Sequence, residues 1–357
     1  MANLMNSEDP EQNPTVPIEN GQEGPSPEII DPVIEENSLE EPEDNAPMSF
    51  LPVYRVRMKF HTIPLIISIL IAGVLAWYVV AVTGFETVIP EANPTQGLVN
   101  GLIYTAFAIV SSVVIYFLVK KKGQNVLKII MTIAFLFLTF TLLLFFGVLL
   151  VPILESSALA YYLYMGFCAI FAVGLTYLYF SGKLSKLLRN IYVLGIGTLI
   201  GAFMGIAMPL WTTIVLLVGI SIWDYISVKR GPIKGIMEIM GHVDPDEVRN
   251  LTKEDLDKAE IQIGIGDVAF YSMLTSGCLI SSGTELFSGF QLTVFGSILT
   301  TILAAIGILV GAFITLRALR KNTILPGLPI SILLGLVLAV LSYITLINID
   351  FFKIVLP

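Results

Sequence analysis

Two aspartates lie inside the long apolar segments of this 357-residue sequence, and their side chains could carry acid–base chemistry. Asp224 occurs in the string IWDY, and Asp267 ends the string GIGD. No other Asp, Glu, Lys, Arg or His lies in the interior of an apolar segment. Because an ionised carboxylate is costly to bury away from water, a carboxylate at such a position is a candidate functional group.

Two carboxylates that face each other at low dielectric cannot both ionise easily, so the pair is expected to share one proton. One carboxylate can then take a proton from water while its protonated partner hydrogen-bonds to a carbonyl oxygen and polarises it. This is the chemistry of aspartic proteases, and it predicts no metal ion and no other cofactor. The two histidines, His61 and His242, lie outside the apolar segments, and no HExxH motif occurs. Serine-type and zinc-type proteolysis within the membrane are therefore excluded.

Glycines occupy positions where a neighbouring backbone could come close. Gly264 and Gly266 leave space beside Asp267 for a substrate backbone or a neighbouring helix, so both are candidate substrate-binding residues. Two rows of glycines at spacings of four predict close helix packing. They are Gly197, Gly201 and Gly205, and Gly307 and Gly311.

A proline-rich stretch begins the last apolar segment. Its two prolines are three residues apart and cannot both lie in a regular helix interior. The stretch either begins a helix with proline in its first turn, or exposes its backbone as a wall of the active site. Beside the two aspartates we favour the wall, and we expect these residues to bind substrate: Pro326, Gly327, Leu328 and Pro329.

The elements that must position these residues are membrane-spanning helices. Hydrophobic residues make up 55% of the chain and charged residues 13%, and the mean hydropathy is +0.83. This composition excludes a soluble globular protein, a disordered protein and a nucleic-acid binder. Nine apolar runs are long enough to cross a bilayer, which takes about 20 helical residues. They cover 63–82, 98–119, 129–150, 158–180, 190–208, 210–228, 263–284, 290–316 and 326–348, with a turn predicted at Pro209.

Basic residues cluster in alternate connections, which predicts the orientation of the chain. They precede the first run and follow the second, fourth, sixth and eighth runs. With nine spans, all these clusters fall on one side, so the N-terminus is predicted in the cytoplasm and the C-terminus outside. Asp224 and Asp267 then lie roughly 7.5 and 9 Å from the cytoplasmic border, on consecutive antiparallel helices.

The sequence divides into a tail and one membrane domain. Residues 1–50 carry thirteen Asp and Glu and no Lys or Arg, and they are predicted to be a disordered acidic tail. The membrane domain, 51–357, is predicted to contain helices 1–6 in 51–228, a polar cytoplasmic loop in 229–262 and helices 7–9 in 263–357. The fold class is therefore an all-α integral membrane protein with nine transmembrane helices.

These features resemble the presenilin and signal peptide peptidase family of intramembrane aspartyl proteases. That family has nine spans, a Tyr-Asp in the sixth, a Gly-x-Gly-Asp in the seventh and a Pro-Ala-Leu-Pro at the start of the ninth. The resemblance covers about 63–357 and implies that Asp224 and Asp267 are the catalytic pair. Trp223 replaces the family tyrosine and Gly327 the family alanine. The compact loops are most similar to those of archaeal homologues, which implies the cell membrane of an archaeon.

The resemblance implies transmembrane peptide or protein substrates within a lipid bilayer, and no nucleic acid. No obligate partner subunit is evident from the sequence. Prepilin peptidases also use a GxGD aspartate, but the nine spans and the proline-rich stretch argue against them. The remaining alternative is an ion- or proton-coupled transporter that uses the two aspartates. Transporters favour internal repeats and sites at the bilayer midplane, and neither is visible here.

Overall fold

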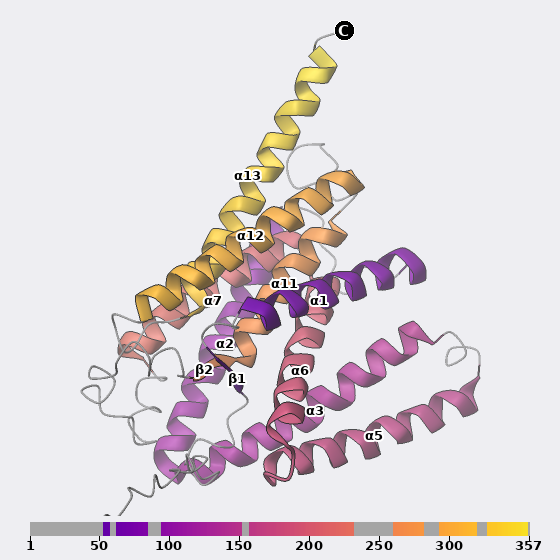
Figure 1. The fold of residues 1–357 in the computed structure, drawn as a ribbon, viewed down its shortest axis with the longest axis vertical. Helices are drawn as coiled ribbons and strands as arrows, with labels where there is room; N and C mark the ends of the chain where they lie inside the picture. Colours follow the sequence, from indigo (N-terminus) through magenta and orange to yellow (C-terminus); the bar gives the residue numbers. More distant parts are fainter. Residues whose placement is uncertain are drawn as a thin grey trace, which may run out of the picture. The chain divides into compact units, whose positions relative to one another are not determined.

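The computed structural model describes residues 53–57, 62–84, 94–151, 157–231, 260–281, 293–319 and 327–355. These residues form nine helices and one pair of strands (Figure 1). The predicted acidic tail and most of the predicted polar loop lie outside the described residues. In chain order, the elements are β1 (Val53–Arg57), α1 (Thr62–Thr83), α2 (Pro94–Lys122), α3 (Gln124–Leu150), α5 (Ala158–Phe180), α6 (Lys186–Ala207), α7 (Leu210–Arg230), β2 (Glu260–Gly264), α11 (Ile265–Ile280), α12 (Val294–Leu319) and α13 (Leu328–Val355).

The nine helices match the nine predicted spans one for one, which confirms the predicted fold class. Eight are long and apolar enough to cross a membrane, and α11 is the exception with 16 residues. At about 1.5 Å per residue α11 is roughly 24 Å long, somewhat less than a bilayer's hydrocarbon core. The predicted turn at Pro209 is confirmed, because α6 ends at Ala207 and Pro209 is the N-cap of α7.

A small β-sheet is the feature that the sequence did not predict. β1 pairs with β2 in antiparallel register, with Tyr54 opposite Ile263 and Val53 opposite Gly264. The seventh apolar run therefore begins as a strand, and its helix starts only at Ile265. The sheet ties the segment before α1 to the segment that leads into the helix carrying Asp267.

Helix α11 is the central element of the packing. It contacts α1, α6, α7, α12 and α13, and ten of its sixteen residues are buried. One apolar cluster joins α11 to α1, α7, α12 and α13, and a second fills the space among α1, α3, α5 and α6. An aspartate near the start of α11 is therefore held by several helices at once.

The two glycine rows pack as the sequence predicts. A Cβ on Gly201 would lie 2.3 Å from Ser272 Cβ, and one on Gly205 would lie 2.6 Å from Ser276 Cβ, so α6 and α11 touch backbone to backbone. A Cβ on Gly311 would lie 2.4 Å from Ser331 Cα, so α12 and α13 also pack with their backbones in contact. Only glycine permits these approaches, because the hydrogen in place of Cβ leaves the space free.

Candidate active site

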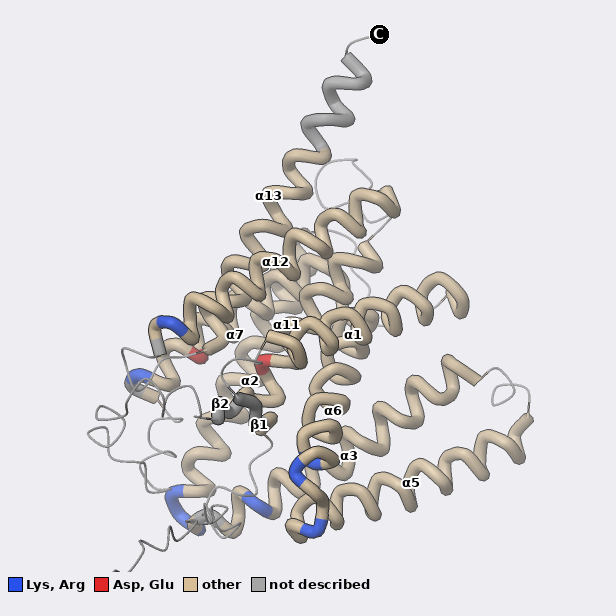
Figure 2. Tube along the Cα trace, viewed as in Figure 1, with Lys and Arg blue, Asp and Glu red and all other residues tan. Residues whose placement is uncertain are grey.

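Asp224 is positioned by the last turns of α7. It lies six residues before the end of that helix at Arg230, and its side chain is partly exposed. Nearby Lys229 donates a hydrogen bond of 2.5 Å to the Tyr225 hydroxyl. Figure 2 shows the basic residues at helix ends and red at two places, near the end of α7 and at the start of α11.

Asp267 is positioned by the change from strand to helix. β2 ends at Gly264, which is the N-cap of α11, and Asp267 is the third residue of the helix. The Asp267 carboxylate accepts a hydrogen bond from the backbone N–H of Gly264. This contact is one half of a capping box, in which the third helical side chain reaches back to the N-cap amide; Gly264 has no side chain to supply the other half. The contact holds the carboxylate at the exposed end of a buried helix.

The two carboxylates lie close enough to interact electrostatically. The helices that carry them, α7 and α11, are in direct contact. The helix start at Gly327–Leu328 completes this arrangement. The backbone N–H of Leu328 donates a hydrogen bond to the Asp224 carboxylate, and a Cβ on Gly327 would lie 3.5 Å from Asp267 Oδ2.

The described part of the proline-rich stretch begins a helix, and its role as a wall of the active site remains a prediction. Leu328 begins α13 and Pro329 lies in its first turn, where a missing N–H costs nothing. The same turn lies beside both carboxylates. Pro326 lies outside the described residues, so its predicted role is not addressed by the structure.

Gly264 and Gly266 leave free space, but no described helix fills it. A Cβ on Gly264 would lie 3.9 Å from Asp267 Oδ2, and one on Gly266 would lie 3.8 Å from Phe270 Cε2. Both are ordinary van der Waals contacts. Substrate binding at these glycines, and at Gly327, Leu328 and Pro329, remains a prediction.

Two buried residues close to the carboxylates were not anticipated from the sequence. Tyr271 and Ser331 hydrogen-bond to each other across α11 and α13. Sequence spacing could have pointed to them. Tyr271 follows Asp267 by four residues and Ser331 follows Gly327 by four, so each lies on the same helix face as the earlier residue. Among the described residues, no three His, Cys, Asp or Glu side chains gather as metal ligands would.

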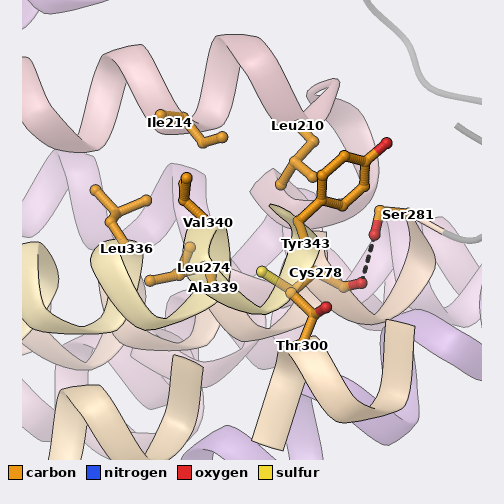
Figure 3. A pocket seen from close by; sticks show the side chains of 10 residues that line it. All are labelled: Leu210, Ile214, Leu274, Cys278, Ser281, Thr300, Leu336, Ala339, Val340 and Tyr343. Atoms are coloured by element: carbon orange, nitrogen blue, oxygen red, sulfur yellow. Dashed lines mark hydrogen bonds between the residues drawn. The ribbon is translucent and has the colours of Figure 1, made fainter. Parts of the chain in front are cut away.

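An apolar pocket lies among α7, α11, α12 and α13, but at the other ends of α7 and α11 (Figure 3). Its lining includes Leu210, the first residue of α7, and Cys278, near the end of α11. The Ser281 hydroxyl donates a hydrogen bond of 2.6 Å to the Cys278 carbonyl at its edge. Its lining residues nearest the aspartates along their helices, Ile214 and Leu274, lie ten residues from Asp224 and seven from Asp267, or roughly 15 and 10 Å, so the pocket does not include the carboxylates.

Comparison with known proteins agrees with this architecture. The presenilin family model matches residues 77–246, a range that includes Asp224 and ends before Asp267. Presenilin-B of Dictyostelium discoideum is 33% identical over 140 residues, which is 38% of this chain and 26% of that relative. The match thus spans only about a quarter of the relative's length.

Solved structures show the same fold. Two structures of a presenilin family intramembrane aspartate protease, in the P2 and C222 space groups, each superpose with a TM-score of 0.51 at 20% identity. They cover 81% and 79% of this chain and 98% of their own chains. The fold and the paired aspartates define a multi-pass membrane protein with a carboxylate pair near one end of its helices. Residues 77–246 of the chain are similar to the presenilin family, and its overall fold is that of the two solved proteases.

Proposed function

We propose that this protein is an intramembrane aspartyl protease that hydrolyses peptide bonds within transmembrane segments, with Asp224 and Asp267 as its catalytic pair. The observation that carries the proposal is the electrostatic interaction of these two carboxylates, which lie on α7 and α11, two helices that pack against each other. The similarity of residues 77–246 to the presenilin family and the fold shared with solved intramembrane aspartate proteases support it further.

The mechanism follows from a shared proton. The ionised carboxylate accepts a proton from water, whose oxygen attacks the scissile carbonyl carbon. The protonated carboxyl gives its proton to the carbonyl oxygen, which produces a tetrahedral diol. Transfer of a proton to the amide nitrogen then breaks the C–N bond and releases a carboxylic acid and an amine. Because Asp224 lies six residues from the end of α7, we expect water to reach the pair from that end of the helix.

The substrate must unwind, since a helical peptide bond is shielded by its own helix. β2 leads directly to Gly264 and Asp267, and its described pairing is with β1 along one edge. A strand with one paired edge leaves a second row of N–H and C=O groups for an extended peptide. We expect the unwound substrate to lie there, between β2 and the Gly327–Pro329 turn.

The proposed orientation places the N-terminus in the cytoplasm and the C-terminus outside, in the cell membrane of an archaeon. Its support is the position of the described basic residues: they occur at the C-terminal ends of α2, α7 and α12 and near the start of α3 and α6, as alternating helices require. We expect transmembrane peptide or protein substrates, and no obligate partner subunit is evident from the sequence. A transporter is the less favoured function, because Asp224 and Asp267 lie near helix ends rather than mid-helix.

The test uses purified protein in liposomes together with a panel of single-span substrates. Mass spectrometry of the products is expected to locate the cut within the span, close to the cytoplasmic border, and chelators are expected to leave cleavage unchanged. Ion uptake without cleavage would instead support the transporter. Cleavage that stops with a chelator would contradict the aspartyl mechanism.

Gly327 offers a graded prediction about the active-site wall. Gly327→Ala is expected to keep cleavage within about threefold, because its Cβ would meet Asp267 Oδ2 at 3.5 Å, an ordinary contact. Gly327→Val adds two methyl groups beside that oxygen and is expected to lower kcat by about tenfold or more. Steady-state cleavage rates of the two variants measure the difference. Equal rates for Ala and Val would show that this wall does not limit the site.

A further inference from the structure

A buried tyrosine links the helix of Asp267 to the turn that contacts both carboxylates. Tyr271 lies one helical turn after Asp267 and is 4% exposed, and it interacts electrostatically with both aspartates. Its hydroxyl hydrogen-bonds to Ser331 of α13, which is fully buried. A buried hydrogen bond between two hydroxyl groups fixes the position of α11 relative to α13 along the helix axes.

The link continues to the backbone of the turn. Ser331 Oγ donates a hydrogen bond of 3.3 Å to the Gly327 carbonyl oxygen. A serine hydroxyl has one proton, so the Tyr271 hydroxyl is the donor to Ser331. The resulting path runs from Tyr271 to Ser331 to the Gly327–Leu328 peptide, whose N–H donates to Asp224.

Ser331 has little freedom to move away from this path. A Cβ on Gly311 would lie 2.4 Å from Ser331 Cα, so α12 presses directly on the backbone of α13 at this residue. Ser331 is thus constrained by the backbone contact with α12 and by the hydrogen bond with Tyr271, and its hydroxyl stays at the first turn of α13.

We propose that Tyr271 is a positioning residue for the proposed protease reaction: through Ser331 it sets the Gly327–Leu328 peptide between the Asp224 and Asp267 carboxylates. The inference rests on the proposed function for its kinetic consequences. Its structural content, an anchored turn, is independent of catalysis. Neither residue touches the reacting atoms.

The test is Tyr271→Phe, which removes one oxygen atom and keeps the ring. Loss of one such hydrogen bond is expected to lower kcat by about tenfold and to change KM by less than about twofold. The matched control is Tyr192→Phe. Tyr192 is 7% exposed and its hydroxyl lies 2.6 Å from Thr139 Oγ1, far along the chain from the carboxylates. The control is expected to lower the thermal unfolding temperature similarly without a change in kcat.

Ser331 variants test the path itself. Ser331→Ala is expected to match Tyr271→Phe, and the double variant to be no slower than either, because the two act as one unit. Ser331→Thr keeps the hydroxyl and is expected to retain most activity. Additive losses, or equal losses of kcat in Tyr271→Phe and Tyr192→Phe, would overturn the inference and leave a structural role only.

Hydrogen exchange separates this inference from the proposed function. In Tyr271→Phe, peptides containing Gly327 and Leu328 are expected to exchange faster than in the wild type, with no such change in Tyr192→Phe. An unchanged exchange rate would overturn the positioning role even if the wild type cleaves substrates. A wild type that cleaves no substrate would overturn the proposed function, while faster exchange would still support the anchored turn.

Discussion

Asp267→Asn is expected to reduce cleavage of a single-span substrate by at least about a thousandfold, because an amide can neither accept a proton from water nor supply one to the scissile carbonyl. Asparagine has nearly the shape of aspartate, so the contact with the Gly264 N–H can persist. The structure of α11 is expected to remain. The measurement is product formation in liposomes, followed for long enough to detect about one thousandth of the wild-type rate.

Asp224→Asn is expected to have the same effect, and the double variant no greater one. Residues that act as a unit in one chemical step lose their contribution together, so the free-energy costs do not add. Asp224→Glu is the informative companion: it keeps a carboxylate but displaces it by one methylene, and we expect partial activity at most.

Stability measurements provide the control for both aspartate variants. A carboxylate removed from a partly buried, like-charged pair relieves desolvation and repulsion, so the thermal unfolding temperature is expected to stay equal or to rise. An inactive variant that is also unfolded would say nothing about chemistry, which is why the folded Asn variants are decisive. Cleavage at more than about 1% of the wild-type rate, at the same peptide bond in either folded variant, would contradict the proposed pair.

The spans and the two aspartates could be predicted because the bilayer imposes strong local rules. Helix α5 occupies 158–180, as predicted, because an apolar run must be helical to satisfy its backbone in lipid. The rarity of charge made Asp224 and Asp267 stand out without any knowledge of their separation. Their proximity could be predicted because both aspartates lie at a similar predicted distance from the cytoplasmic border. Consecutive antiparallel helices place residues of similar depth side by side.

The sheet and the Tyr271 path could not be predicted, because both join segments that are distant in sequence. β1 and β2 lie about two hundred residues apart, and no local pattern of a five-residue strand names its partner. The boundary of α11 was placed at 263 instead of Ile265 for the same reason: Ile263 and Gly264 are apolar, and only their pairing with β1 makes them a strand. The Tyr271–Ser331 bond depends on the rotation of α11 against α13, which glycine packing sets.

Gly201→Ala is expected to destabilise the protein, although alanine is the better helix former. The added Cβ would lie 2.3 Å from Ser272 Cβ and 2.5 Å from the Ala269 carbonyl oxygen, so α6 and α11 must move apart. Overpacking of this kind costs about 1–3 kcal/mol of the free energy of unfolding. Because Ala269 and Ser272 follow Asp267 on the same helix, separation also displaces the carboxylate, and kcat is expected to fall by about tenfold or more.

Gly195→Ala is the matched control on the same helix, since a Cβ at Gly195 meets nothing within 4 Å. Without a clash, only helix propensity remains, and alanine is expected to raise stability by up to about 1 kcal/mol. The two glycines should therefore respond with opposite signs to one substitution, as measured by thermal unfolding in detergent. A tolerated alanine at Gly201, with unchanged unfolding temperature and unchanged kcat, would mean that α6 does not hold α11 against its neighbours. The α6–α11 contact would then not be what fixes the position of Asp267.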